Sequence, residues 1–203
     1  MTLQVKISKK LVPYKTAFKL LKKRVELVKK SEGKELVWIL EHPITYTSGI
    51  RSKANEILDK KIKIIPTNRG GKITLHSPGQ KIVYFVLNLN KRRKDIKNLV
   101  RQIELSIIDL LKLYQIKSYA DKKNIGIWVK NKKIAAIGIR VSSWVAYHGF
   151  SINISNDLKY YKKIIPCGLD NTKVTTVMTE SKIKISNIEN ILKDIFLKKL
   201  KKI

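Results

Sequence analysis

Cysteine is nearly absent from this chain of 203 residues, in which Cys167 is the single example. One thiol cannot form an internal disulfide, so we expect the protein to work in a reducing compartment. Long apolar runs are missing as well. No stretch reaches the roughly 18 apolar residues that a membrane-spanning helix needs, and the first residues lack the apolar core of a signal peptide. The sequence therefore predicts a cytoplasmic protein without a membrane segment.

Acidic residues are scarce, with 15 Asp and Glu against 44 Lys and Arg and a formal net charge of +29. Such an excess is typical of proteins that bind nucleic acids, because basic side chains neutralise phosphates. However, only seven of the basic residues are arginine, the residue that readers of bases and phosphates favour. The lysines accompany abundant Ile and Asn, a pattern of nucleotide bias in the coding sequence. We therefore favour solvated surface lysines, and keep a basic face for an acidic macromolecular partner as the alternative.

The sequence contains no internal repeat, no low-complexity linker and no break in composition that would mark a domain boundary. We predict a single domain over residues 1–203, a length that can bury a sufficient core without disulfides. Metal and nucleotide cofactors are not expected. His42, His76 and His148 are too far apart for zinc-site spacing, and neither a P-loop nor a dinucleotide-binding fingerprint occurs.

The pattern of apolar residues predicts an α+β fold, in which helices pack against one mixed, largely antiparallel sheet. The first strand alternates apolar and polar residues, as an edge strand does. Residues 45–55 are polar and are predicted as a loop. Ser186 and Glu189 have the spacing of a capping box, with Ser186 as the N-cap of the last helix. The predicted strands cover residues 2–7, 36–40, 72–75, 81–89, 125–129, 134–140 and 150–154, and the predicted helices cover residues 14–30, 95–114 and 186–202.

Two consecutive glycines, Gly70 and Gly71, directly follow Arg69. Because they have no Cβ, they would let the backbone run close to a ligand. Arg69 and His76 lie at the two ends of a short predicted strand, just before a tight turn. Adjacent glycines are more often an ordinary turn, so this motif alone leaves both interpretations open.

Small residues occupy the middle of the predicted strand that follows Lys133. Side chains alternate along a strand, so Lys133 should share a face with residues 135, 137 and 139, whereas Ala136 and Gly138 should face the other way. Small residues weaken a strand unless something approaches closely there. Lys133 itself ends the polar run 130–133, and composition alone makes it one more solvated lysine.

Cys167 lies between a proline, which restricts the backbone, and a glycine, which allows close approach to the surrounding peptide N–H groups. Such an N–H can donate to a developing oxyanion. A lone cysteine is otherwise a small buried apolar residue. Neither interpretation is excluded by the local sequence.

Taken together and in this order, these segments resemble the lipoyl(octanoyl) transferase family. The likeness spans about half the chain, and although each fragment is weak, the ordered set is specific. The segment 40–47 also looks like an earlier part of the family pattern. The matching residues are Arg69–Gly71, His76, Pro78–Gln80, Lys133–Ala135, Gly138–Arg140, Trp144, Tyr147–Gly149, Asn153, Asp157, Leu158 and Pro166–Gly168.

The resemblance implies a fold akin to that of biotin and lipoate protein ligases, and it implies a reaction. An octanoyl group would pass from acyl carrier protein to the lysine ε-amine of a lipoyl domain, the first step of lipoate biosynthesis. Cys167 would carry the acyl thioester and Lys133 would activate its thiol. The implied substrate pocket consists of Arg69, Gly70, Gly71, Lys72, Ile73, Thr74, Leu75, His76, Ala136, Ile137, Gly138, Gly149, Phe150 and Ser151.

Two positions depart from the family pattern. Ser77 replaces a usual glycine, and Ser151 places a hydroxyl in a wall expected to be apolar, so either change would bear on acyl preference. His76 and His148 are expected to shape the pocket only.

The resemblance also implies the partners. The donor would be octanoyl-acyl carrier protein, and the acceptors would be the lipoyl domains of 2-oxoacid dehydrogenase complexes and the glycine cleavage H protein. No ATP is required, because the thioester is already activated. The closest rival is an ATP-dependent lipoate-protein ligase of the same fold, which would not need Cys167. A basic nucleic-acid-binding module is the non-enzymatic rival. We expect neither nucleic acid nor membrane as a partner.

Overall fold

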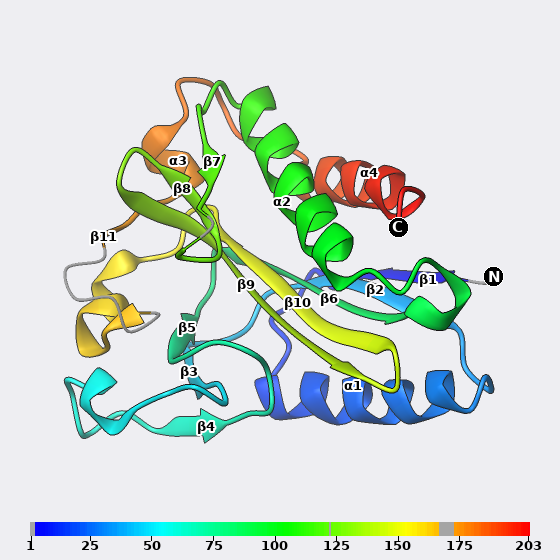
Figure 1. Ribbon diagram of the computed structural model, residues 1–203. Coiled ribbons are helices and arrows are strands. Elements are labelled where there is room, and N and C mark those ends of the chain that lie inside the picture. Colours follow the sequence, from blue (N-terminus) through cyan, green and yellow to red (C-terminus); the bar gives the residue numbers. More distant parts are fainter. Residues whose placement is uncertain (1–2, 122, 167–172) are drawn as a thin grey trace.

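The computed structural model describes residues 3–121, 123–166 and 173–203 (Figure 1). Within these residues, the main sheet has eight strands, with seven in the order β1-β2-β6-β10-β9-β8-β7 and β11 paired to β9. The pairs β1–β2 and β9–β11 are parallel and the others are antiparallel, which confirms the predicted mixed, largely antiparallel sheet. The strands are β1 (Leu3–Ile7), β2 (Glu35–Leu40), β6 (Gln80–Asn88), β7 (Tyr119–Ala120), β8 (Ile127–Val129), β9 (Lys132–Ser142), β10 (Val145–Asn153) and β11 (Lys173–Val174).

Helices cover both faces of this sheet: α1 lies on one face, and α2 and α4 lie on the other (Figure 1). The central strands are therefore apolar throughout residues 36–40 of β2 and 82–87 of β6, because successive side chains enter opposite cores. Val37 and Ile39 pack towards α2 and α4, whereas Leu36 and Trp38 pack towards α1. The helices are α1 (Tyr14–Lys29), α2 (Ile96–Leu113), the short α3 (Val177–Glu180) and α4 (Ile188–Leu200).

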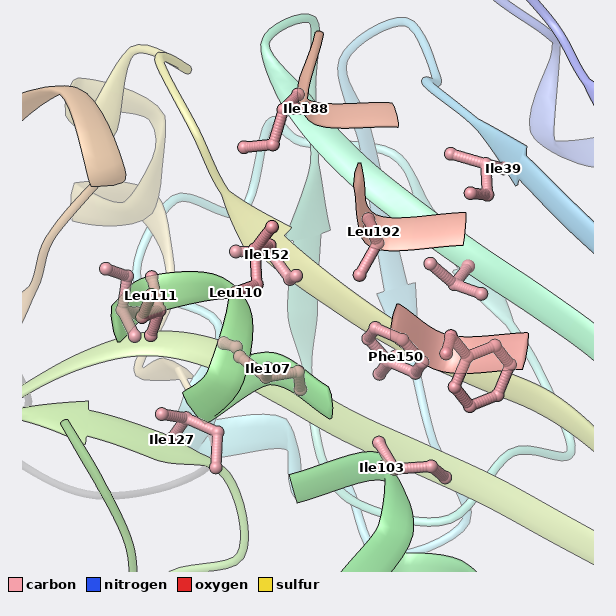
Figure 2. Close-up of a cluster of buried hydrophobic side chains, with 14 of the residues drawn as sticks. Ile39, Ile103, Ile107, Leu110, Leu111, Ile127, Phe150, Ile152, Ile188 and Leu192 are labelled. Carbon is pink, nitrogen blue, oxygen red and sulfur yellow. The ribbon is translucent and has the colours of Figure 1, made fainter. Parts of the chain in front are cut away.

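The larger core lies between β10 and the pair of helices α2 and α4. Figure 2 shows Phe150 and Ile152 of β10 among side chains of both helices. Phe196 of α4 contacts the Phe150 ring edge-on, with 5.4 Å between ring centroids. The other core residues labelled in Figure 2 are Ile39, Ile103, Ile107, Leu110, Leu111, Ile127, Ile188 and Leu192.

A second, three-stranded sheet lies beside the main one within the described residues, in the order β4-β3-β5. Its core contains Tyr46, Leu75 and Tyr161. The prediction of a loop over 45–55 was wrong at its start, because β3 pairs with β5 and with β4. Only Tyr46 supplies an apolar anchor there, so the strand depends on pairing with distant segments. The elements are β3 (Thr45–Ser48), β4 (Ile64–Pro66), β5 (Thr74–His76) and the 3₁₀ turns η1 (Ala54–Glu56), η2 (Leu89–Lys91) and η3 (Leu158–Lys163).

The helix limits predicted from periodicity are confirmed for α1 and α2 to within a residue or two, but the capping box of the last helix was wrong. Asn187 is the N-cap of α4, and its side chain makes no capping hydrogen bond. Glu189 instead forms an ion pair with Lys81 on β6, which also pairs with Glu41. A long-range ion pair has therefore replaced the local cap. Among the described residues, no helix is long and apolar enough to cross a membrane.

β10 begins five residues earlier than predicted, at Val145. The turn before it consists of Ser143 and Trp144, both in the left-handed region with φ of 49° and 59°. Two-residue hairpin turns of this kind usually contain Asn or Gly. Neither residue type is present at these two positions, so this turn could not be predicted from its residues.

Candidate active site

A cavity of about 280 Å³ lies on the α1 face of the main sheet. Strands β9 and β10 form its floor, and the segment 69–74 forms a wall. Tyr14 and Tyr84 line its buried end. Arg51 and Lys123 are exposed and lie on its rim. Such a space, buried at one end and open at the other, suits a ligand that enters end-on.

Glycines and small residues keep the floor flat. In the β9–β10 register, Gly138 lies opposite Gly149, and Ala136 lies opposite Ser151. A Cβ on Gly149, whose φ is +155°, would lie 1.9 Å from the Val83 carbonyl oxygen, so no other residue fits there. Other atoms therefore do approach the small residues closely, as predicted. Near Gly149 these atoms belong to the backbone of Val83 in the same chain.

The Arg69–Gly71 segment rests directly on this floor. The Gly70 N–H donates to the Ile139 carbonyl at 3.2 Å, and a Cβ on Gly138 would lie 3.4 Å from Cδ of Arg69. The Arg69 guanidinium is buried and donates from Nη2 to the carbonyl and the hydroxyl of Thr47, both at 2.9 Å. Arg69 thus fixes the wall to β3.

A second loop supports this wall from outside. The Ile50 and Arg51 N–H groups donate to the carbonyls of Arg69 and Gly71, each at 3.1 Å. The Lys72 ammonium lies 3.1 Å from the buried carboxylate of Glu56. These contacts hold the segment that contains the two glycines in place.

Neutral polar side chains line or lie directly behind the buried end. Burial lowers the pKa of His76 to about 3, with a further contribution from the positive form of His42 nearby. His76 Nδ1 lies 2.8 Å from Oε1 of Gln80, while His42 Nε2 lies 2.9 Å from the Tyr84 hydroxyl. Burial likewise lowers the pKa of His42 to about 4. Both rings are therefore uncharged at neutral pH.

His148 completes this polar end. Burial, reinforced by the charges of Arg69 and Arg140, lowers its pKa to about 3. Its Nε2 lies 2.8 Å from Oδ1 of Asn68, and its ring stacks on Phe18. Among the described residues, no group of three or more His, Cys, Asp or Glu side chains is arranged to hold a metal ion.

Lys133 is buried in the cavity wall, with 6% of its surface exposed. This excludes the solvated lysine that composition alone suggested. The face assignment was also wrong. Ala135 pairs with Ile127 but Lys133 pairs with Trp128, so Ile134 is an extra residue at a β-bulge. Because a bulge shifts the alternation by one, Lys133 lines the cavity while Ile134 and Ala135 enter the core.

Cys167 lies outside the described residues. The described chain resumes at Lys173, which pairs with Lys132, and Val174 then pairs with Lys133. The Thr175 N–H donates to the Lys133 carbonyl at 3.0 Å. Strand β11, six residues after Cys167 in the sequence, is thus adjacent to the buried lysine.

The comparison with protein families decides the assignment. The family model of the lipoyl protein ligase A/B catalytic domain matches residues 13–203. The chain belongs to this family. The order of the motifs predicted the lipoyl(octanoyl) transferase family, and this family match together with the octanoyltransferases below confirms that prediction. An octanoyltransferase of Wolbachia pipientis wMel is 43% identical, covering 95% of this chain and 97% of the relative. One from Anaplasma phagocytophilum is 40% identical, covering 98% and 99%.

Solved structures confirm the fold that the sequence predicted. A bipartite lipoate protein ligase of Thermoplasma acidophilum superposes with a TM-score of 0.74 at 17% identity, covering 99% of this chain and 84% of that one. A biotin protein ligase of Aquifex aeolicus gives a TM-score of 0.51 at 14% identity, covering 100% and 69%. The lipoyl protein ligase A/B domain of this chain therefore has the biotin and lipoate ligase fold.

All but one of the described pocket residues proposed from the sequence line the cavity. Leu75 does not, because it points into the core of the small sheet, whereas its neighbours Thr74 and His76 face the cavity. Side chains alternate along a strand, so this difference between Leu75 and its neighbours on β5 could have been predicted from the sequence. His148, which was expected to shape the pocket, lines the cavity. The cavity residues that the sequence did not single out are Tyr14, Arg51, Ile82, Tyr84, Lys123, Asn124 and Ile125.

Proposed function

We propose that this chain transfers an octanoyl group from an acyl carrier protein to the ε-amine of a lysine on lipoyl domains, through a thioester on Cys167. It acts as one catalytic domain in the first step of lipoate biosynthesis. Relatives about 40% identical over nearly the whole chain are octanoyltransferases. The observation that carries the proposal is the buried amine of Lys133 in the wall of a cavity with a flat, glycine-lined floor.

The cavity suits a short acyl chain. Ile73 and Ile82 supply apolar walls, whereas the side chains of Ile137 and Phe150 pack into the core on the other face of the sheet. A cavity of about 150 Å³ already accommodates benzene, so about 280 Å³ leaves room for eight carbons. The neutral histidines at the buried end complete the space without placing a charge beside the chain.

The proposed mechanism begins with thiolate formation. A lysine ammonium within about 4 Å favours the thiolate and lowers the pKa of the Cys167 thiol. The thiolate attacks the carbonyl carbon of the donor thioester, forming the bond to Cys167 and breaking the bond to the carrier sulfur. Lys133 gives its proton to the departing carrier sulfur.

The second half returns the proton. An amine must be uncharged to attack, and the now neutral Lys133 accepts the proton that the acceptor amine loses. Attack on the octanoyl-Cys167 carbonyl forms the amide and releases the thiolate. The Thermoplasma acidophilum ligase was solved as part of a study with its E2 lipoyl domain, which supports lipoyl domains as the acceptor class. Because the thiol must stay reduced, we place the reaction in the cytoplasm.

The test uses the wild-type protein, octanoyl-acyl carrier protein and a lipoyl domain, without ATP. The intact mass of the lipoyl domain should increase by one octanoyl group. A matched reaction with free octanoate and ATP should leave the mass unchanged. The opposite pattern, with ATP-dependent transfer from the free acid alone, would identify a ligase of the same fold instead.

The charged residues on the rim of the cavity favour an acidic protein as the acyl donor. Arg51 and Lys123 come from loops on separate segments, and neither forms an ion pair with a described residue. The Asp121 carboxylate instead accepts the N–H groups of Lys123 and Asn124, at 2.7 and 2.9 Å. The apolar neighbours of the two cations, Ile50 and Ile125, are exposed by 62% and 48%. Cations beside exposed apolar side chains suit an acidic protein surface.

We therefore expect Arg51→Ala and Lys123→Ala each to raise KM for the octanoyl carrier by about 3- to 10-fold at low salt, because steering charges act on encounter. The difference from wild type should shrink above about 0.5 M salt, where the Debye length is only a few ångströms. Lys198→Ala, on the exposed side of α4, is the matched control. Equal KM values for the rim and control variants would show that Arg51 and Lys123 do not contribute to binding of the donor.

A further inference from the structure

The chain segment that enters β8 encloses the side chain of Lys133. Its ammonium donates to the Ile125 carbonyl at 2.8 Å. The same nitrogen lies 5.4 Å from the centroid of the Trp128 ring. Gly126 lies between these two contacts along the chain, next to the lysine stem. We call the Ile125 carbonyl, Gly126 and the Trp128 ring the ammonium cage.

Gly126 leaves the space that the lysine stem occupies. Its φ is +141°, a conformation that side chains with a Cβ rarely adopt. A Cβ built there would lie 2.4 Å from Cε of Lys133 and 3.0 Å from its Nζ. It would also lie 2.7 Å from the Ala135 carbonyl oxygen, which belongs to the β-bulge strand and cannot simply rotate away. An alanine at this position must therefore displace the lysine.

Trp128 forms the other side of the cage. Its ring is buried, with 6% of the residue exposed, and its Nε1 donates to the Asn124 carbonyl at 2.9 Å. That hydrogen bond fixes the ring orientation, and an aromatic face attracts a nearby ammonium. Trp128 is also the residue that pairs with Lys133 across the bulge. One residue thus sets both the direction of the lysine and the surroundings of its charge.

We propose that Gly126 and Trp128 are positioning residues that hold the Lys133 ammonium at one point of the cavity wall. The inference rests on the proposed role of Lys133 towards the Cys167 thiol. The attraction between an ammonium and a thiolate weakens as they separate. A displaced ammonium therefore changes the pH at which the thiol ionises, and a purely structural role for the cage does not.

The other charged groups around this wall stay unchanged in the test. Arg51, Arg69 and Lys123 line the cavity, and Lys72 is held by Glu56. At the edge of β9, the Lys132 ammonium lies 3.4 Å from the Glu180 carboxylate. None of these residues is substituted, so a shift in thiol ionisation reports on the cage.

The experiment measures the rate of iodoacetamide alkylation against pH. Cys167 is the single cysteine, so the rate reports its thiolate directly and needs no donor. Lys133→Met defines the full upward shift of the midpoint. Gly126→Ala and Trp128→Leu should each move the midpoint upward by at least about one pH unit, a tenfold loss of thiolate at pH values below the midpoint. Trp128→Phe, which keeps an aromatic face, should restore most of the wild-type midpoint.

Gly33→Ala is the matched control. Gly33 also has a crowded Cβ position, 2.7 Å from Cβ of Leu27, but it lies beyond the end of α1 and does not line the cavity. It should lose stability without moving the midpoint. A shift in Lys133→Met together with wild-type midpoints in Gly126→Ala and Trp128→Leu would overturn the cage alone. No shift in Lys133→Met would overturn both the cage and the proposed role of Lys133.

Discussion

Replacing Lys133 by methionine should slow formation of the octanoyl thioester on Cys167 by about 10²- to 10⁴-fold, the usual contribution of a positioned acid or base. Methionine matches the length of the stem and fills the space beside Gly126, so the wall keeps its packing. It cannot carry charge or a proton. The thiol would then ionise like an unassisted cysteine, and the departing carrier sulfur would have no donor.

Intact-mass measurement over time gives the rate for this variant. Cys167→Ser should show no thioester at any time, which identifies the acylated residue. Lys132→Met is the matched control, because Lys132 is the adjacent residue on β9 but its ammonium points to Glu180. Its rate should stay within about twofold of the wild type, since a surface ion pair contributes little. Acylation of Lys133→Met at the wild-type rate would remove this lysine from the chemistry.

Stability should fall steeply between pH 7 and pH 5. Burial holds the pKa of His42 at about 4 and the pKa values of His76 and His148 at about 3, all below the ordinary 6.5. Between pH 7 and pH 5 these three histidines bind protons in the unfolded chain but stay uncharged in the folded protein. Stability is therefore full above pH 6.5 and decreases as the pH falls towards the folded values. Each histidine should cost about 2 kcal/mol at pH 5.

Three such contributions, about 6 kcal/mol together, approach the whole stability of an ordinary domain. The carboxylates do not obscure the effect. Burial alone would raise the pKa of Glu189, but the Lys81 hydrogen bond, a backbone hydrogen bond and the Lys81 charge together lower it, so its contribution is lost only below about pH 4.5. Urea unfolding at pH 7, 6 and 5 provides the measurement. His148→Gln should reduce the pH dependence by about a third, and a constant unfolding midpoint would show that the histidines are accessible to protons.

Periodicity predicted α1 and α2 well because each helix buries one continuous stripe of apolar residues. The spacing of these residues in the sequence therefore shows which side of the helix packs on the sheet. β3 and the Ser143–Trp144 turn were not predictable in this way. A polar strand is stabilised by partners that lie far away in sequence. A left-handed turn without glycine or asparagine is enforced by the pairing of the long strands on either side of it.

The candidate site shows the same division. The glycine motifs pointed to the floor and the wall, since a missing Cβ is visible in the sequence. The orientation of Lys133 was not visible, because it depends on one extra residue in β9 that strict alternation does not allow for. Tyr14 and Tyr84 enter the cavity through the packing of α1 on β6, and only the assembled layers bring them to the same end.

The Arg69–Gly71 segment rests on the glycine floor. This contact limits where the protein can be engineered to accept acyl chains of other lengths. A Cβ on Gly149 would collide with the Val83 backbone, and a Cβ on Gly138 would already touch Cδ of Arg69 and the Gly70 carbonyl oxygen at 3.4 Å, so the floor has no room for a larger side chain. The buried end of the cavity can be adjusted gradually. Tyr14 and Tyr84 meet the cavity through their side chains, so smaller residues there could lengthen the accepted chain one or two carbons at a time. Selection for new acyl groups should therefore accumulate changes in α1 and β6 and leave the motif glycines untouched.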